Sequence, residues 1–164
     1  MLLTAILLLL VQAGLGVAAN LYVTVPAHHP GARPGNYFAG SVHSVAWAIA
    51  HTAAALAIHA ALGLALAAFA IGAAVHALRS GRRAVGGWSL LAGLFVIGAG
   101  FNGASFLDFA HDISSLIMGL LALAAIGCYA IAVTLLGVAS QPSTGYRHPP
   151  DETSEERHQT DPGV

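Results

Sequence analysis

The chain has 164 residues, of which 57% are hydrophobic and only 8% are charged, with a formal net charge of −1. Soluble domains carry about 25% charged residues, so this deficit indicates an integral membrane protein and argues against a soluble enzyme. No basic stripe is present, which argues against binding of nucleic acid. The single cysteine, Cys128, cannot form an intrachain disulfide, and its apolar surroundings indicate a small buried side chain.

Four apolar stretches reach the length of about 20 residues that a helix needs to cross a bilayer core of ~30 Å. They lie at about 2–21, 52–78, 85–106 and 113–136. The connections between the later stretches are short, which predicts an all-α membrane protein, an antiparallel four-helix transmembrane bundle. Glycines in the later spans favour close packing of the helices.

The first span, 2–21, could be a retained helix or a cleaved signal peptide. Residues 17–19 read VAA, which fits a small-residue cleavage site. However, no positive charge precedes the apolar run, and this run continues to Val25 with little interruption. We therefore expect the first span to be retained.

Residues 22–51 are predicted to form an outer loop that contains a short helix. The stretch PAHHPGARPGNY is rich in proline and glycine dipeptides, which block regular structure. After it, apolar residues recur at helical spacing, at Val42, Val45, Ala46 and Ile49. This stripe predicts an amphipathic helix over 41–50 that lies at the outer interface, with Trp47 at the headgroup level. One helix over 41–78 would be about 57 Å long, so we expect the chain to turn before the second span.

The connection between the second and third spans sets the predicted topology. It reads RSGRR and contains three arginines, and short arginine-rich loops stay cytoplasmic. Segments 22–51 and 102–112 are then outside, and the tail from Gly137 is cytoplasmic. The N-terminus is also cytoplasmic if the first span is retained. Lysine is absent, whereas alanine and glycine are abundant. This bias suggests a GC-rich bacterial genome, so we expect a multi-pass protein of a bacterial plasma membrane.

Residues 137–164 differ in composition from the membrane domain over 1–136. They are polar, contain several prolines and have no apolar periodicity. Such a segment cannot bury enough surface to offset the entropy of ordering. We therefore expect a disordered cytoplasmic tail, in which the acidic run DETSEE is solvated.

This topology brings polar residues that are distant in sequence to the outer surface. The stretch FNGASFLDFAHD contributes Asn102, Asp108, His111 and Asp112. The outer loop adds four histidines, namely His28, His29, His43 and His51. Asp112 precedes the fourth span, so we expect it to cap that helix and to interact favourably with its dipole.

His59 lies within the second span, where an ionisable side chain must face the bundle interior or a cavity. Together with His111 it could ligate haem b, because a haem site in a bundle needs two facing imidazoles. The other spans contain no histidine, and only His111, at the start of the fourth span, comes within plausible depth. His28 and His29 with His111 could bind a transition metal, although their spacing matches no metal signature. The alternative is a buried imidazole bonded to a neighbouring helix, for which Asn102 and Ser105 are candidate partners.

The sequence contains no phosphate-binding loop and no GxSxG motif, so we expect no enzymatic activity. The favoured function is a non-catalytic structural or interaction subunit that contacts the lipid bilayer and either another membrane protein or a second copy of itself. The first alternative is an outer-leaflet haem- or metal-binding protein centred on His59 and His111, with His43 or His51. The second is a transporter or channel subunit with an outer half-channel through His59, Asp108, His111 and Asp112, although the first, third and fourth spans offer no carboxylate near the midplane.

Overall fold

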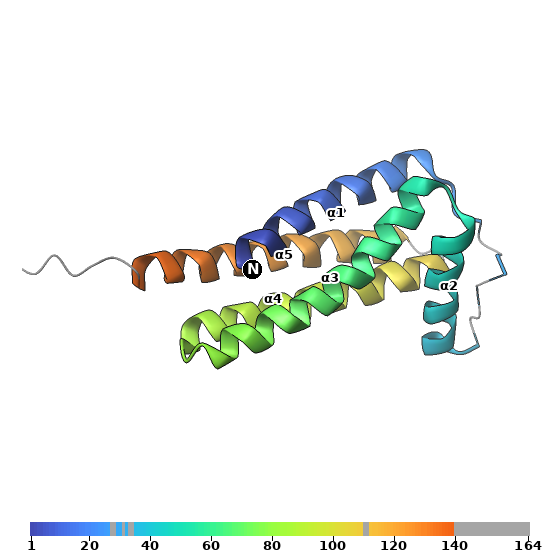
Figure 1. Cartoon of the computed structure of the whole chain (residues 1–164). Helices are drawn as coiled ribbons and strands as arrows, with labels where there is room; N and C mark the ends of the chain where they lie inside the picture. The colour runs from blue at the N-terminus through green and yellow to red at the C-terminus, as the bar shows by residue number, and fades with distance from the viewer. Residues whose placement is uncertain (27–28, 31, 33–34, 110–111, 140–164) are drawn as a thin grey trace, which may run out of the picture.

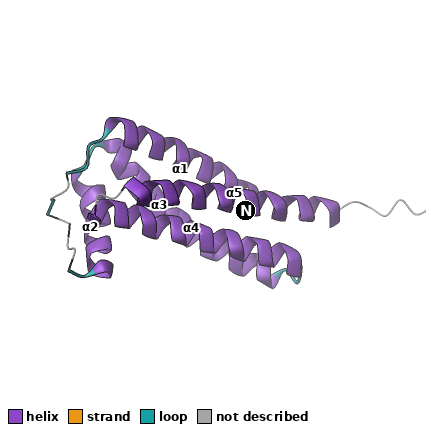
Figure 2. Cartoon of the chain, turned by 180° about the vertical axis from the view of Figure 1, so that it is seen from behind, coloured by secondary structure: helices purple, strands orange, loops and turns teal. Residues whose placement is uncertain are grey.

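The computed structural model describes residues 1–26, 29–30, 32, 35–109 and 112–139, with only the helical backbone of Asp112 and Ala139. Within these residues every regular element is an α-helix (Figures 1 and 2). In chain order they are α1 (Leu2–Tyr22), α2 (Tyr37–His51), α3 (Ala54–Arg79), α4 (Arg83–Phe109) and α5 (Asp112–Ala139). The predicted fold class, an all-α membrane bundle of four long helices with one additional short helix, is confirmed.

The four long helices α1, α3, α4 and α5 are long and apolar enough to cross a membrane. Each overlaps one predicted span to within three residues at either end. With 21 residues, α1 is about 32 Å long, close to the ~30 Å bilayer core. The other three have 26, 27 and 28 residues, so they must tilt or extend beyond the core. Only 17–28% of the most apolar stretch of each helix is buried within the protein, which leaves most of this surface for lipid.

The long helices form a closed ring. Both α1 and α4 pack between α3 and α5, on opposite sides of the bundle. Alanine is the commonest residue in the buried core of the bundle, which also contains the fully buried Tyr129. Small side chains let helix backbones approach closely, and this contact stabilises helix pairs where lipid already surrounds their apolar surfaces.

The turn between α3 and α4 is short because α3 ends in a compact cap. The hydroxyl of Ser80 donates a hydrogen bond to the carbonyl of Ala77 at 2.6 Å. Gly81 follows with a φ of 75°, in the left-handed region that glycine adopts at little cost. The arginines of this turn are all exposed, namely Arg79, Arg82 and Arg83. We call this end of the bundle the arginine end.

The short helix α2 lies across the opposite end of the bundle, here called the α2 end (Figure 1). It begins at Tyr37, four residues before the predicted start, because the side chain of Asn36 accepts a hydrogen bond from the backbone N–H of Ala39 at 3.1 Å and caps the helix. Thr52 has extended backbone angles and ends the helix. The expected turn between the short helix and the second span is therefore present at Thr52–Ala53. The location of α2 at a bilayer surface stays a prediction.

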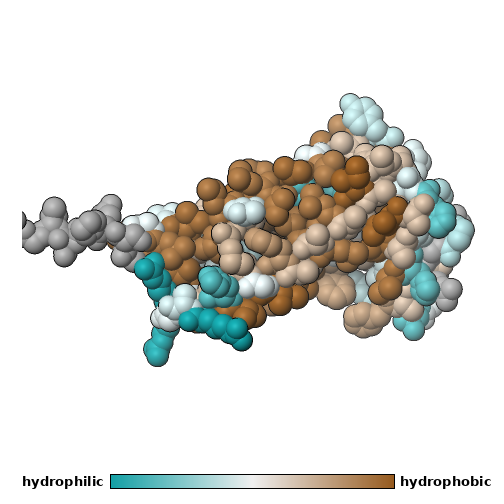
Figure 3. Space-filling view, viewed as in Figure 1, coloured by the Kyte–Doolittle hydropathy of each residue, from teal (hydrophilic) through white to brown (hydrophobic). Residues whose placement is uncertain are grey.

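The surface of the protein separates into three zones along the bundle. Figure 3 shows hydrophobic residues over the middle of the long helices and hydrophilic residues at both ends. On the face shown, one hydrophilic zone lies at the arginine end, and the other lies at the α2 end, where it is mixed with apolar residues. This division is what a membrane-spanning bundle requires, since charged groups are costly in the hydrocarbon core.

Candidate functional site

A face of small residues holds α2 against the bundle. Its buried residues are Gly40, Ser41, Ser44 and Ala48, and they face α3 and α4. Part of the apolar stripe recognised in the sequence is turned away from the bundle, since Val42 is 69% exposed and Ile49 is also exposed, whereas Val45 packs against buried residues of the bundle. The small residues therefore form the buried contact, Val45 and Trp47 pack beside it, and Val42 and Ile49 remain at the surface.

Asp108 joins α4 to this face of α2. Its side chain is only 4% exposed. The fully buried Ser44 donates a hydrogen bond from its hydroxyl to Oδ1 of Asp108 at 3.2 Å. A carboxylate is tolerated at such depth only when hydrogen bonds or charges compensate for lost water. The position of Asp108 thus explains one candidate residue as part of a contact between helices.

His29 brings the loop between α1 and α2 into the same region. The buried imidazole lies with Nε2 2.8 Å from the carbonyl oxygen of Leu107. Its ring also stacks on the indole of Trp47, with centroids 3.9 Å apart and an angle of 16° between the planes. We call His29, Ser44, Trp47 and Asp108 the α2-end cluster.

The α2-end cluster contains part of the polar convergence expected from the topology. His29 of the loop and Asp108 of the third span do meet at one end of the bundle. His43 and His51 are exposed on α2. His28, His111 and the side chain of Asp112 lie outside the described residues, so the expected capping role of Asp112 stays a prediction.

The contacts of His59 lie within the bundle, between α3 and α1. Its Nδ1 is 3.2 Å from the carbonyl oxygen of Gln12, and its Nε2 is 3.5 Å from Nε2 of Gln12. The Gln12 amide also donates a hydrogen bond to the carbonyl of His59 at 2.9 Å. The imidazole is thus bonded to a neighbouring helix, but the expected partners were wrong. Asn102 instead donates to the carbonyl of Gly98 on its own helix at 2.9 Å.

Two glycines make this contact between His59 and Gln12 possible. A Cβ added to Gly16 would lie 2.9 Å from Cε1 of His59, and one added to Gly63 would lie 3.1 Å from Nε2 of Gln12. Each glycine follows a polar partner by four residues, so each polar side chain rests on the glycine of the opposite helix. Sequence reasoning missed Gln12. The signal that could have found it is an amide within an apolar span, four residues before a glycine, as in the pair His59 and Gly63.

The contact with Gln12 occupies His59, which was the expected haem or metal ligand of the second span. Both ring nitrogens of His59 face Gln12, so this side chain would have to leave Gln12 before it could ligate iron or another metal. In the part of the chain that the structure describes, no three histidine, cysteine, aspartate or glutamate side chains gather as metal ligands. His111, the expected second ligand, is not among the described residues.

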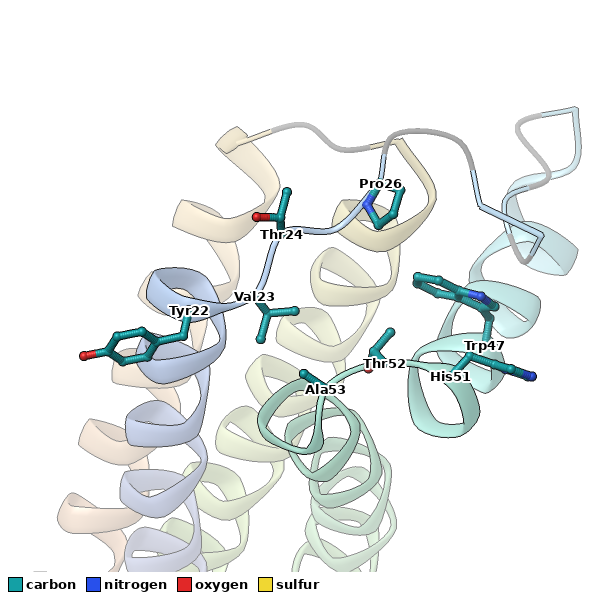
Figure 4. A pocket seen from close by; sticks show the side chains of 8 residues that line it. All are labelled: Tyr22, Val23, Thr24, Pro26, Trp47, His51, Thr52 and Ala53. Atoms are coloured by element: carbon teal, nitrogen blue, oxygen red, sulfur yellow. The ribbon is translucent and has the colours of Figure 1, made fainter.

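An open cavity of about 360 Å³ lies at the α2 end, between the end of α1 and the turn from α2 to α3 (Figure 4). Its walls are Tyr22, Val23, Thr24, Pro26, Trp47, His51, Thr52 and Ala53. The side chains of Tyr22 and His51 point in opposite directions, away from the hollow. The hydroxyl of Thr52 donates to the carbonyl of Ala48. In most ligand sites a few polar groups converge on the ligand. The polar groups around this cavity do not converge on one point.

Comparisons with protein-family models, with curated proteins and with solved structures found no match.

Proposed function

We propose that this membrane protein is a non-catalytic structural or interaction subunit. One observation carries the proposal: among the described residues, three of the polar side chains best suited to chemistry, His59, Asp108 and His29, are engaged in contacts between separate parts of the bundle. His59 contacts α1 through Gln12, Asp108 contacts α2 through Ser44, and His29 contacts the α4 backbone at Leu107. A catalytic group needs free access to its substrate, and these contacts limit that access.

The surface offered to a partner is the outward side of α2. At 100° per residue, α2 has three sectors about 120° apart. One sector faces the bundle with Ser44 at its centre, and a second exposes Phe38, Val42 and Ile49. The third exposes His43. A helix that lies at a membrane surface beside a bundle contacts protein, lipid and water. We assign the first sector to the contact with the bundle, the second to lipid and the third to water.

The arrangement also supports a specific orientation in a bacterial plasma membrane. We assign the arginine end to the cytoplasm on the basis of the arginine-rich turn, so α2 faces outward. We also assign α1 as a retained span, because it closes the ring against α3 and α5 and supplies Gln12 to His59.

Site-specific photo-crosslinking in cells tests the proposal with two adjacent positions. A photoreactive residue is placed at His43, in the sector assigned to water, and in a second variant at Val42, in the sector assigned to lipid. We expect a discrete protein adduct from position 43 and none from position 42. An adduct of twice the mass of the chain identifies a second copy as the partner. The absence of any protein adduct at position 43 would contradict the proposal.

The purified protein provides an independent measurement. We expect no Soret absorbance and no stoichiometric metal, because His59 is bound to Gln12. A Soret band or bound metal that disappears in His59→Ala would contradict the proposal and establish a ligand-binding protein instead. The matched control is His76→Ala, which changes an exposed histidine of α3 that belongs to no proposed ligand set.

A further inference from the structure

A shallow apolar groove runs along α4 at the arginine end. It has a volume of about 290 Å³ and is lined by Ala84, Gly87, Trp88 and Leu91. A Cβ added to Gly87 would meet no atom within 4 Å, so the hollow is open on the outside of the bundle. Trp88 is half-buried beside it and packs against the core. The indole of Trp88 thus forms one wall of a groove in which an elongated apolar group can lie.

The arginines lie at the end of this groove. Arg83 is the first residue of α4 and lies one turn before Gly87, on the same side of the helix. Arg79 and Arg82 are exposed in the adjoining turn. The acidic residues within the described part of the chain are Asp108 and Asp112, and both lie towards the α2 end. The described residues therefore leave the positive charge at the groove without an acidic neighbour.

We propose that this site binds an anionic phospholipid, with an acyl chain in the groove beside Trp88 and the phosphate against Arg82 and Arg83. Arginine presents a planar set of donors that matches phosphate oxygens. Trp88 lies five residues beyond Arg83, about 8 Å along the helix, which suits an indole just below a headgroup. Along the helix, the arginines are followed by the apolar groove. A phospholipid has the same order, with its phosphate followed by its acyl chains.

Charge favours a lipid over a second copy of the chain in this groove. A second copy packed through the same face would bring its own arginines against these, and like charges in contact repel. An anionic headgroup instead neutralises them, and basic residues next to membrane helices are attracted to anionic lipids. The inference does not depend on the proposed function, since a lipid could bind here whatever the role of α2.

Tryptophan fluorescence can test the site directly because the chain contains only two tryptophans. In Trp47→Phe the emission comes from Trp88 alone. The full-length variant is reconstituted in phosphatidylcholine vesicles that contain brominated phosphatidylglycerol or, at the same mole fraction, brominated phosphatidylcholine. We expect the anionic lipid to quench Trp88 with an apparent association constant about fivefold higher or more, since one arginine near an anionic lipid contributes on the order of fivefold.

Three variants of the Trp47→Phe protein identify the parts of the site. Arg82→Gln with Arg83→Gln should remove the preference for the anionic lipid while both lipids still quench. Gly87→Leu should lower quenching by the anionic lipid because it fills the groove. Trp88→Phe in the otherwise native chain moves the reporter to Trp47 at the α2 end, where we expect no preference. Circular dichroism checks that each variant retains its helices.

Three results would overturn the proposal. One is equal quenching of Trp88 by the two lipids, or a preference that survives in Arg82→Gln with Arg83→Gln. Another is no quenching by either lipid, which would mean that protein covers the groove. The third is a preference that appears only after residues 140–164 are deleted, because the acidic tail of the chain would then occupy the arginines.

Discussion

The two ends of the bundle use polar residues in opposite ways. At the α2 end, His29, Ser44 and Asp108 are buried and bonded across helices. At the arginine end, Arg82 and Arg83 are exposed beside an apolar groove. Polar side chains at the two ends of this bundle therefore have different roles, and the extent of their burial distinguishes the two. The first role stabilises the fold, and the second leaves the side chains available to a ligand.

The largest change in stability is expected when the carboxylate of Asp108 is removed. We expect Asp108→Ala to lower the free energy of unfolding by about 1–3 kcal/mol, because it leaves the buried hydroxyl of Ser44 without its acceptor. Unfolding in mixed detergent micelles measures this change. Asp108→Asn is the matched control, since it retains an acceptor oxygen and should cost less. Equal stability of Asp108→Ala and the native chain would mean that the α2-end cluster does not stabilise the fold.

A smaller effect is expected at the contact between α1 and α3. A double-mutant cycle with Gln12→Ala and His59→Ala isolates the contact between the two side chains, whose Nε2 atoms lie 3.5 Å apart, because the two shorter hydrogen bonds end on backbone carbonyls that both substitutions retain. We expect a coupling energy of about 0.6 kcal/mol, the average for polar contacts between membrane helices. The same cycle with Gln12→Ala and Asn102→Ala is the control. It should give almost no coupling, because Asn102 bonds to the carbonyl of Gly98 on its own helix. Equal coupling in the two cycles would contradict the observed geometry.

The smallest change in stability is expected at the arginine end. Arg82→Gln with Arg83→Gln should alter the free energy of unfolding by no more than about 0.5 kcal/mol, as is usual for exposed positions, while it removes the preference for anionic lipid. The same unfolding assay and the fluorescence assay measure the two effects on one preparation. A large loss of stability in this variant would show that both ends of the bundle stabilise the fold and would remove the contrast.

The long helices could be predicted closely from the sequence because span length and hydropathy are local properties. Each predicted span matched a helix to within three residues. The turn after His51 was also predictable, since a single helix through that region would have been too long. The start of α2 was placed four residues late because the capping contact of Asn36 was not considered.

The contacts between helices were much harder to predict. Sequence gives the depth of His59 in its span, but its partner depends on how α1 and α3 are rotated and how closely they cross. Gln12 could be reached only because Gly16 and Gly63 let the two helices approach. The same limit applied to Ser44, since the apolar stripe of α2 was the strongest pattern in that segment. In this chain the weaker pattern, a run of small residues, makes the protein contact.

The connection between α2 and α3 has a mechanical consequence. Only Thr52 and Ala53 separate the two helices, and two extended residues span at most about 7 Å. With so short a connection, the C-terminal end of α2 has to stay next to the first turn of α3. A force that a bound neighbour applies to α2 would therefore act on the first turn of α3. His59 lies in the next turn, so the same force would act on its contact with Gln12 of α1.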